Sequence, residues 1–149
     1  MKKKTTAQKP VIEIFRPWQG KSLELDLYTT KISAGFPSPA DDFLDRKLDL
    51  NEYLIRNPSA TFLVRVDGNS MVNAGISDDD ILIVDRSVEA TDGKVVIGVI
   101  DGEFTVKRII KKGKKLFLKP ENEKFNPIEI TGDMDFKIWG VVVYTIHKI

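Results

Sequence analysis

The 149-residue sequence contains no cysteine and only one histidine, His147, close to its C-terminal end. Without cysteine, the chain cannot form disulfides, use a thiol nucleophile or build a cysteine-based zinc site. A single histidine makes a zinc or iron centre unexpected, and a histidine at a chain end is more typical of a surface than of a Ser–His–Asp triad. The glycines form no phosphate-binding loop. We therefore expect neither a metal nor another cofactor.

Long apolar runs and an excess of charge of one sign are also absent. No run approaches the roughly 18–20 apolar residues that a membrane span needs, and the lysine-rich start is followed by polar residues, unlike a signal peptide. The net charge is +1, which gives no general attraction to nucleic acid or to anionic membranes. We expect a cytoplasmic protein that binds no membrane and recognises no DNA sequence directly.

Residues 1 to about 38 differ from the rest of the chain. Leu23–Tyr28 alternates apolar and charged side chains, as in a strand with one exposed face. The stretch Ser33–Pro39 combines small residues with prolines, which favours an extended backbone. We predict that this region is an arm that lies on a body and not a domain of its own.

Two short helices are predicted at the start of the body. Residues 38–48 begin like a helix, because Ser38 can cap the N-terminus and Pro39 fits the first turn. Two aspartates follow, and their charge suits the positive end of a helix dipole. Residues 49–55 predict a second helix with an acidic start, which Asn57–Pro58 ends.

The remainder of the chain predicts a compact, mostly antiparallel β domain. Asp101–Gly102 is a typical two-residue hairpin turn. The lysine-rich residues 111–115 predict a second turn, which could contact DNA but is more typical of a solvated hairpin tip, because no basic face accompanies it. The predicted strands are Thr61–Val66, Ile81–Val84, Val95–Ile100, Glu103–Ile109, Leu116–Leu118 and Phe136–Tyr144.

The turn Asp67–Met71, directly after a predicted strand, is the most informative local motif. A sharp turn at a strand end can present the hydroxyl of Ser70 at a sheet edge and aim nearby backbone N–H groups at a substrate carbonyl. The N–H groups of Ser70 and Met71 are the candidates for stabilising an oxyanion. The alternative is an ordinary β-turn in which the serine caps a backbone group.

A nucleophilic serine needs a base, and without a usable histidine the candidates are carboxylates and lysines. Lys107 is the lysine of interest, because it lies in the predicted strand Glu103–Ile109 among apolar neighbours that favour partial burial. Burial could lower its pKa from about 10.4 to near 7 or 8, where a neutral amine can accept a proton. The alternative is a strand lysine whose amine reaches water.

Taken together, these motifs resemble the family of LexA- and UmuD-like self-cleaving serine/lysine peptidases. The similarity spans Gly35 to about Val143. Its Gly-Phe-Pro-Ser-Pro start and its Asp-Gly-Glu-Phe-Thr-Val-Lys run resemble the UmuD branch more than LexA. The matching segments, in the order expected of the family, are Gly35–Ala40, Asp49–Asn51, Pro58–Thr61, Gly68–Met71, Gly75–Asp78, Leu82–Asp85, Asp101–Lys107 and Trp139–Val142.

The resemblance implies a role for each candidate residue and a LexA/UmuD-type β fold. Ser70 matches the family nucleophile, Lys107 matches the neutral lysine base, and Ala34–Gly35 matches the bond that is cut. The resemblance therefore implies a cleavable N-terminal arm over residues 1–34 and a β domain over residues 35–149. Some UmuD-like proteins carry cysteine before this glycine, whereas Ala34 is the LexA-type residue. A small residue there still suits the chemistry, because it allows the substrate backbone to approach the serine closely.

The resemblance also implies partners. In the family, a RecA filament on single-stranded DNA stimulates self-cleavage during the SOS response to DNA damage. The trimmed form acts as a homodimer and joins a UmuC-like Y-family polymerase for translesion synthesis. A homodimer also fits the apolar run Val141–Val143, which could pair across an interface.

Three functions are alternatives to a UmuD-like self-cleaving peptidase. A LexA-type or phage repressor needs a helix-turn-helix ahead of the peptidase, but the first 34 residues contain Pro10 and Pro17 and lack a helical pattern. A signal-peptidase-like enzyme also uses a serine–lysine pair but would want a membrane anchor. A non-enzymatic role as a polymerase accessory dimer is compatible with a peptidase that acts once.

Overall fold

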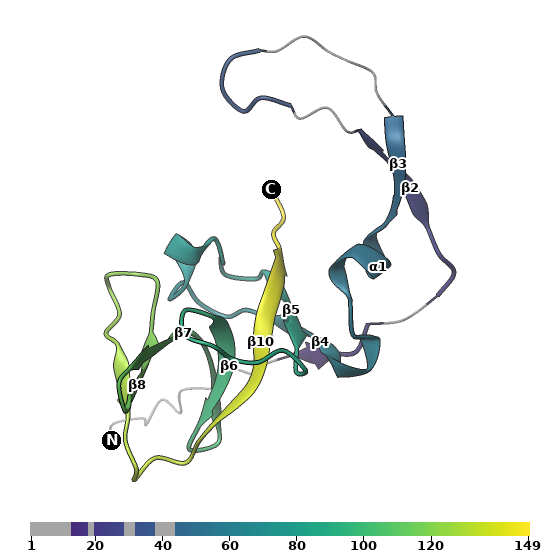
Figure 1. Cartoon of the computed structure of the whole chain (residues 1–149). Coiled ribbons are helices and arrows are strands. Elements are labelled where there is room, and N and C mark those ends of the chain that lie inside the picture. Colours follow the sequence, from purple (N-terminus) through teal and green to yellow (C-terminus); the bar gives the residue numbers. More distant parts are fainter. Residues whose placement is uncertain (1–12, 18–19, 29–31, 38–43) are drawn as a thin grey trace, which may run out of the picture.

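The computed structural model describes residues 13–17, 20–28, 32–37 and 44–149. In this part of the chain, an antiparallel sheet has the strand order β1-β4-β5-β10-β6-β7-β8-β9, and a separate two-stranded ribbon pairs β2 with β3 (Figure 1). The strands are β1 Ile14–Phe15, β2 Glu24–Tyr28, β3 Leu44–Asp49, β4 Thr61–Arg65, β5 Ile81–Asp85, β6 Val95–Ile100, β7 Glu103–Lys112, β8 Lys115–Lys119, β9 Ile128–Ile130 and β10 Phe136–Ile146. The predicted class, a mostly β domain of the LexA/UmuD type, is confirmed.

The central strands of the large sheet form where the sequence is most continuously apolar. β5 and β6 carry buried side chains at consecutive positions, as expected of strands covered on both faces. Asp101 and Gly102 join β6 to β7 with positive φ angles of 48° and 81°, which matches the turn that tight hairpins prefer. The predicted strands of the β domain are therefore confirmed, with small differences at their ends.

The long strand β10 joins the two halves of the sheet, because it pairs with β5 on one side and with β6 on the other. Its register shifts between Ile138 and Gly140 and again between Val142 and Tyr144, and such bulges bend a strand. Gly140 lies so close to β5 that a Cβ atom there would be 2.6 Å from Val84 Cγ1. Only glycine fits at this point of the bend.

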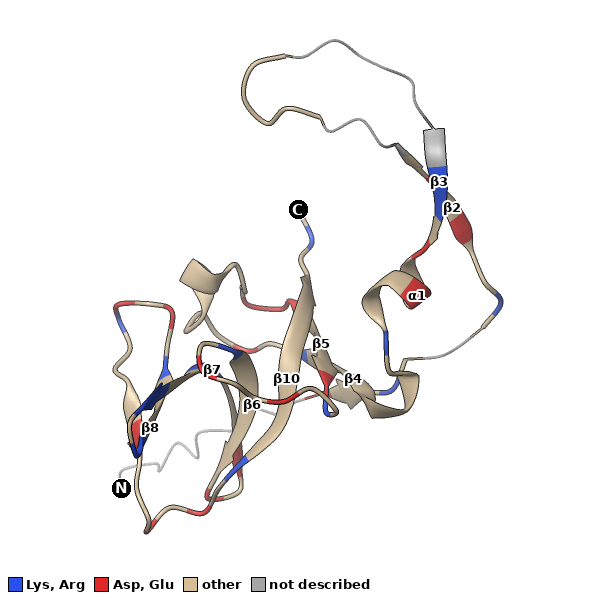
Figure 2. Cartoon of the chain, viewed as in Figure 1, with Lys and Arg blue, Asp and Glu red and all other residues tan. Residues whose placement is uncertain are grey.

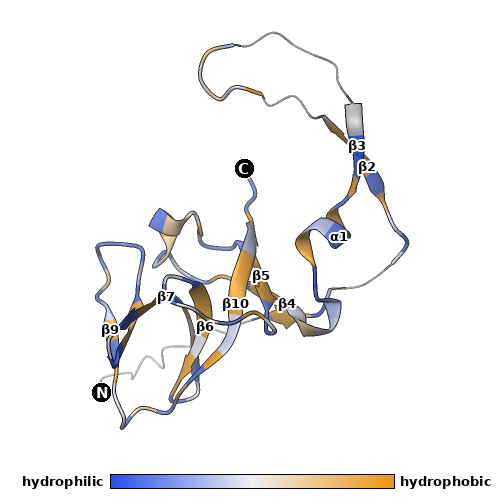
Figure 3. Cartoon of the chain, in the orientation of Figure 1, coloured by the Kyte–Doolittle hydropathy of each residue, from blue (hydrophilic) through white to orange (hydrophobic). Residues whose placement is uncertain are grey.

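Two buried clusters hold the β domain together, and Figure 3 shows hydrophobic residues along β4, β5, β6 and β10. The residues of the first cluster come mainly from β4, β5 and the loop between them, and those of the second come from β6, β7, β8 and β10. The first contains Val64, Val66, Met71, Ile76, Leu82, Val84 and Ile97, and the second contains Val96, Ile109, Leu118 and Val141.

The helix predicted over residues 38–48 is wrong where the structure describes it. Leu44–Asp49 is the strand β3, which pairs with β2 in antiparallel register, and residues 38–43 lie outside the described part. The second predicted helix is confirmed as α1, Leu50–Leu54, whose N-terminus is capped by Asp49. Two short 3₁₀ turns, Pro58–Ala60 and Val72–Ala74, follow.

The lysine-rich turn at residues 111–115 joins β7 to β8 as predicted. Figure 2 shows acidic and basic residues close together around this hairpin. Lys115 lies 3.7 Å from Glu129 on β9, and the backbone N–H of Lys111 donates to Asp92. The charge of Lys115 is thus paired with a neighbouring carboxylate, whereas Lys111 contacts Asp92 through its backbone. Among the described residues, no helix has the length and apolar character to cross a membrane.

Candidate active site

Ser70 lies in the turn that follows β4, where the chain leaves the sheet. Gly68 begins this turn with a φ of 94°, a conformation that glycine adopts without strain. Its N–H donates to Asp78 Oδ1 at 2.7 Å. Met71, the residue after Ser70, is buried in the first core cluster and anchors the turn to the β domain. The serine side chain is therefore presented from a fixed backbone.

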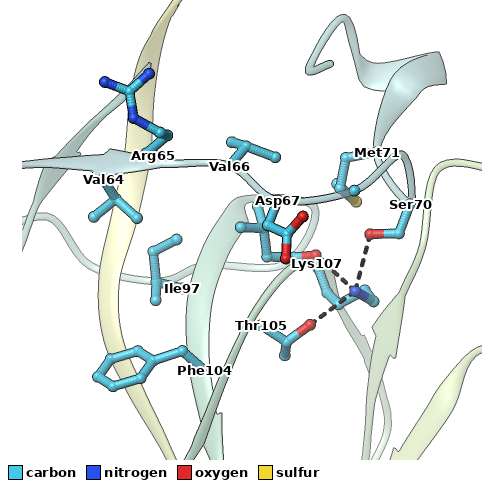
Figure 4. Close-up of a pocket in the computed structure, with 12 residues that line it drawn as sticks. Val64, Arg65, Val66, Asp67, Ser70, Met71, Ile97, Phe104, Thr105 and Lys107 are labelled. Carbon is cyan, nitrogen blue, oxygen red and sulfur yellow. Dashed lines mark hydrogen bonds between the residues drawn. The ribbon is translucent and has the colours of Figure 1, made fainter. Parts of the chain in front are cut away.

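Lys107 lies in the middle of β7 and points toward this turn. Its Nζ is 3.1 Å from Ser70 Oγ, 2.8 Å from Thr105 Oγ1 and 2.9 Å from the carbonyl oxygen of Val106 (Figure 4). Thr105 reaches the same amine because residues two apart in a strand share a face. The structure thus brings together the two candidate residues that the sequence singled out, which are 37 positions apart.

Burial lowers the pKa of Lys107 below its ordinary value, because an ammonium group loses its hydration inside the protein. Its three hydrogen-bond partners are two hydroxyls and a carbonyl, and none of them carries a negative charge that would favour the protonated form. A neutral amine has two N–H donors and one lone pair. In the neutral form, donation to Thr105 and Val106 would leave the lone pair to accept the hydroxyl proton of Ser70.

A groove next to Ser70 is lined on its apolar side by core and strand residues. The side chains of Val66, Ile97 and Phe104 border it, and Figure 4 shows Asp67 and Lys107 at the same opening. The residues that line it are Val64, Arg65, Val66, Asp67, Gly68, Ser70, Met71, Ile97, Phe104, Thr105, Val106 and Lys107.

Ala34 and Gly35 do not line this groove. They belong to the described segment Ile32–Pro37, which is exposed throughout and lies beyond the β2–β3 ribbon, away from the large sheet (Figure 1). The N–H of Gly35 donates to Ser33 Oγ at 3.2 Å, a contact within the segment itself. The structure therefore does not bring the predicted cleavage bond to Ser70.

His147 takes no part in this site. Its Nδ1 lies 2.6 Å from Oδ1 of Asp80, a buried carboxylate that also accepts from the Ser77 N–H at 2.8 Å. Burial raises the pKa of Asp80, but these hydrogen bonds outweigh that effect and hold the pKa below its ordinary value. The side chain of His147 is 47% exposed, so it is a surface residue with one buried partner. In the described residues, no cluster of three potential metal ligands is present.

Thr105 was not predicted as a partner of Lys107, although residues two positions apart in the predicted strand Glu103–Ile109 share a face. Glu121 and Asn122, which contact the turn that carries Ser70, were not predicted either. The alternation of side chains along β7 could have indicated Thr105. No local pattern marks the other two, because their contacts depend on how the chain folds back after β8.

Comparison with known proteins places this β domain in a peptidase class. Residues 26–143 match the Peptidase S24-like family, and the chain belongs to that family. It is 43% identical to Protein MucA of Salmonella typhimurium over 123 residues, which cover 82% of this chain and 84% of MucA. It is 41% identical to Protein ImpA of Shigella flexneri over 126 residues, or 82% of this chain and 83% of ImpA.

A LexA repressor from Shewanella piezotolerans is 38% identical over 119 residues, which cover 79% of this chain but only 57% of the repressor. MucA and ImpA are matched over most of their length, whereas LexA is matched over a part. The resemblance to LexA- and UmuD-like peptidases that the sequence predicted is confirmed, and its relatives of similar length are UmuD-like.

Proposed function

We propose that the chain is a UmuD-like self-cleaving peptidase in which Ser70 is the nucleophile and Lys107 the general base. The observation that carries the proposal is the 3.1 Å contact between Lys107 Nζ and Ser70 Oγ, combined with a burial that lowers the pKa of the amine. A serine hydroxyl becomes a competent nucleophile only when a neighbouring base removes its proton. Membership of a peptidase family supports the same role.

The chemistry follows from the proton balance of the pair. Neutral Lys107 accepts the hydroxyl proton while Ser70 Oγ attacks the carbonyl carbon of Ala34. The resulting oxyanion is stabilised by the backbone N–H groups of Ser70 and Met71. The lysine ammonium then gives its proton to the nitrogen of Gly35, and the C–N bond breaks. Water, deprotonated by the same amine, hydrolyses the acyl–serine ester and restores the hydroxyl.

Cleavage requires the segment around Ala34 and Gly35 to enter the groove beside Ser70, because in this structure it lies outside. The small side chain of Ala34 and the bare backbone of Gly35 permit a close approach to the hydroxyl. Tethering to the same chain, or to a partner subunit, raises the effective concentration of the bond. The reaction separates an arm, residues 1–34, from a β domain, residues 35–149.

The biological role that we propose follows the UmuD-like relatives. A RecA filament on single-stranded DNA stimulates cleavage in the cytoplasm after DNA damage. The trimmed homodimer then serves as an accessory subunit of a UmuC-like Y-family polymerase that copies past lesions. The similarity to MucA and ImpA over more than four-fifths of their length supports this assignment over that of a repressor.

The test is to incubate the purified full chain and to follow the masses of its products. We expect fragments that end at Ala34 and begin at Gly35, and none from Ser70→Ala or Lys107→Met. Lys112→Met is the matched control, because this exposed lysine lies on the same strand β7. Cleavage by Ser70→Ala at the same bond would refute the assigned nucleophile.

The cleavage rate is also expected to depend on pH in one direction. Protonated Lys107 cannot accept the hydroxyl proton, so the first-order rate constant should rise as the pH is raised through the pKa of the amine. Since burial lowers that pKa, half of the maximal rate should be reached below the ordinary value for lysine, about 10.4. Mass spectrometry of samples taken between pH 6 and 10 measures the profile. A rate that falls with rising pH would contradict a lysine base.

A further inference from the structure

The turn that carries Ser70 lies outside the sheet, so its position depends on contacts that other segments make with it. One set comes from its own loop and includes the Gly68–Asp78 hydrogen bond. A second set comes from Glu121 and Asn122, which follow β8. The proposed chemistry uses neither of these two residues directly.

Glu121 and Asn122 bind the turn on both sides of the nucleophile. The backbone N–H of Glu121 donates to the carbonyl oxygen of Ser70 at 2.9 Å, and its own carbonyl accepts from the N–H of Asn73 at 2.9 Å. The Nδ2 group of Asn122 donates to the carbonyl oxygen of Asn69 at 2.8 Å. Three hydrogen bonds thus hold the backbone at Asn69, at Ser70 and at Asn73.

The strand β7 in turn holds Glu121. Arg108 Nε donates to Glu121 Oε1 at 2.5 Å, and the Glu121 side chain is only 19% exposed, so solvent screens this pair less than a surface ion pair. Arg108 is also bound to the carbonyl of Gly93 at 2.6 Å. Lys107 and Arg108 are consecutive in the strand and face opposite ways. One contacts the hydroxyl of Ser70 directly, and the other fixes its carbonyl through Glu121.

We propose that Glu121 and Asn122 are positioning residues for the nucleophile, which hold the backbone of Asn69 and Ser70 so that the hydroxyl stays within reach of Lys107. This inference rests on the proposed role of Ser70. A hydroxyl has only one rotatable bond between it and the backbone, so a displaced turn displaces the oxygen. A shift of about 1 Å in a reacting group can reduce a rate by about a hundredfold.

Asn122→Asp is the sharpest variant for testing this role. It keeps the Oδ1 acceptor that binds the N–H of Lys124 at 3.0 Å but replaces the amide donor with a carboxylate that repels the Asn69 carbonyl. We expect the self-cleavage rate constant of the full chain to fall about tenfold, a loss that a misplaced reacting group can readily produce. The rate at which a fluorophosphonate labels Ser70 should fall by the same factor, because this small reagent reports the serine without the arm.

Asn126→Asp is the matched control, since it makes the same chemical change at an exposed position of the same loop. A second pair tests the Arg108 contact. Glu121→Gln keeps an oxygen acceptor for Arg108 and should retain most of the labelling rate, whereas Glu121→Met should lose it. Melting temperatures of all four variants should stay close to that of the parent chain.

The inference is overturned if Asn122→Asp cleaves and labels as fast as Asn126→Asp. It is also overturned if two results occur together. The first is that Asn122→Asp loses rate only in proportion to the fraction of the protein that is unfolded, and the second is that Glu121→Gln is labelled as slowly as Glu121→Met. The role of the two residues is then structural. The Ser70→Ala chain separates this result from the parent proposal. If Ser70→Ala still cuts, the assigned nucleophile is wrong; if it is inert while Asn122→Asp cuts normally, only the positioning role fails.

Discussion

The large sheet and the β2–β3 ribbon both consist of antiparallel strands but differ in what covers them. Leu82 in β5 is 0% exposed, whereas Leu25 in β2 is 44% exposed. Figure 1 shows the ribbon projecting beside the sheet rather than packing into it. The candidate dyad lies in the part with a core, and the predicted cleavage bond lies beyond the ribbon. Buried packing thus supports the two candidate side chains, while the segment that carries the predicted cleavage bond is exposed.

The largest expected effect comes from exchanging a core leucine for alanine. Leu82→Ala should reduce the free energy of unfolding by about 2–5 kcal/mol, the range for a fully buried leucine that leaves a cavity. Leu25→Ala makes the same change in the ribbon and should cost much less, because much of its side chain already contacts water. Urea denaturation followed by circular dichroism measures both. Equal losses would show that the ribbon belongs to the cooperative core.

A smaller effect is expected from the buried carboxylate of Asp85 at the end of β5. It accepts from Asn57 Nδ2 at 2.8 Å and from Ser87 Oγ at 2.6 Å. Burial raises the pKa of Asp85, but these donors outweigh burial and hold the pKa below its ordinary value. A lowered pKa in the folded state means that the stabilisation is complete above the unfolded-state pKa and is lost as the pH falls through the folded-state pKa.

We therefore expect the unfolding free energy to drop below about pH 4, near the ordinary pKa of aspartate. Asp85→Asn should flatten this drop and cost about 1–3 kcal/mol at pH 7, as for other buried groups that lose a partner. Asp26→Asn, at an exposed position of the ribbon, is the control and should leave the pH curve unchanged. Urea titrations between pH 2.5 and 7 distinguish the two. If the unfolding free energy falls equally steeply with falling pH in the parent chain and in Asp85→Asn, this carboxylate is not a source of acid sensitivity.

The two regions also differ in how far their structure could be predicted from the sequence. Strands such as β5 and β6 were predictable because continuous apolar runs have few other ways to be buried. The strand β3 was not predictable, because the capping pattern at Ser38 and Pro39 favours a helix. Leu44–Asp49 becomes a strand through its pairing with β2. In a half-exposed ribbon, local secondary-structure preference has little influence, because each strand depends on a partner strand that lies far away in the sequence.

The candidate site also contains some residues that could be predicted from the sequence and others that could not. Ser70 and Lys107 stood out because a glycine-containing turn and a strand lysine among apolar residues carry local signals. Their 3.1 Å contact depends on the packing of β7 against the loop after β4, which no local pattern encodes. Glu121 and Asn122 could not be predicted, because Glu121 contacts the turn through its backbone and Asn122 through a side-chain amide. Such donors occur in almost any sequence and mark no particular site.

The smallest effect is expected where the ribbon joins the helix α1, at Asp49. Its carboxylate accepts from Ser22 Oγ at 2.7 Å and from the N–H of Leu23 at 3.0 Å, and it caps α1 by accepting from the N–H of Asn51 at 2.8 Å. One side chain thus connects the residues just before β2 to the start of α1. Asp49→Ala removes all of these acceptors at once but touches neither core cluster.

Asp49→Ala should therefore loosen the ribbon without unfolding the β domain. Hydrogen exchange at the amides of Leu23 and Asn51 should accelerate about tenfold, since a tenfold change corresponds to about 1.4 kcal/mol of local opening. Amides of β5 and β6 should keep the exchange rates of the parent chain, and Asp26→Ala serves as the control within the ribbon. Faster exchange throughout β5 and β6 would mean that the ribbon and the sheet open together, which would remove the distinction between an exposed ribbon and a sheet that supports the candidate dyad.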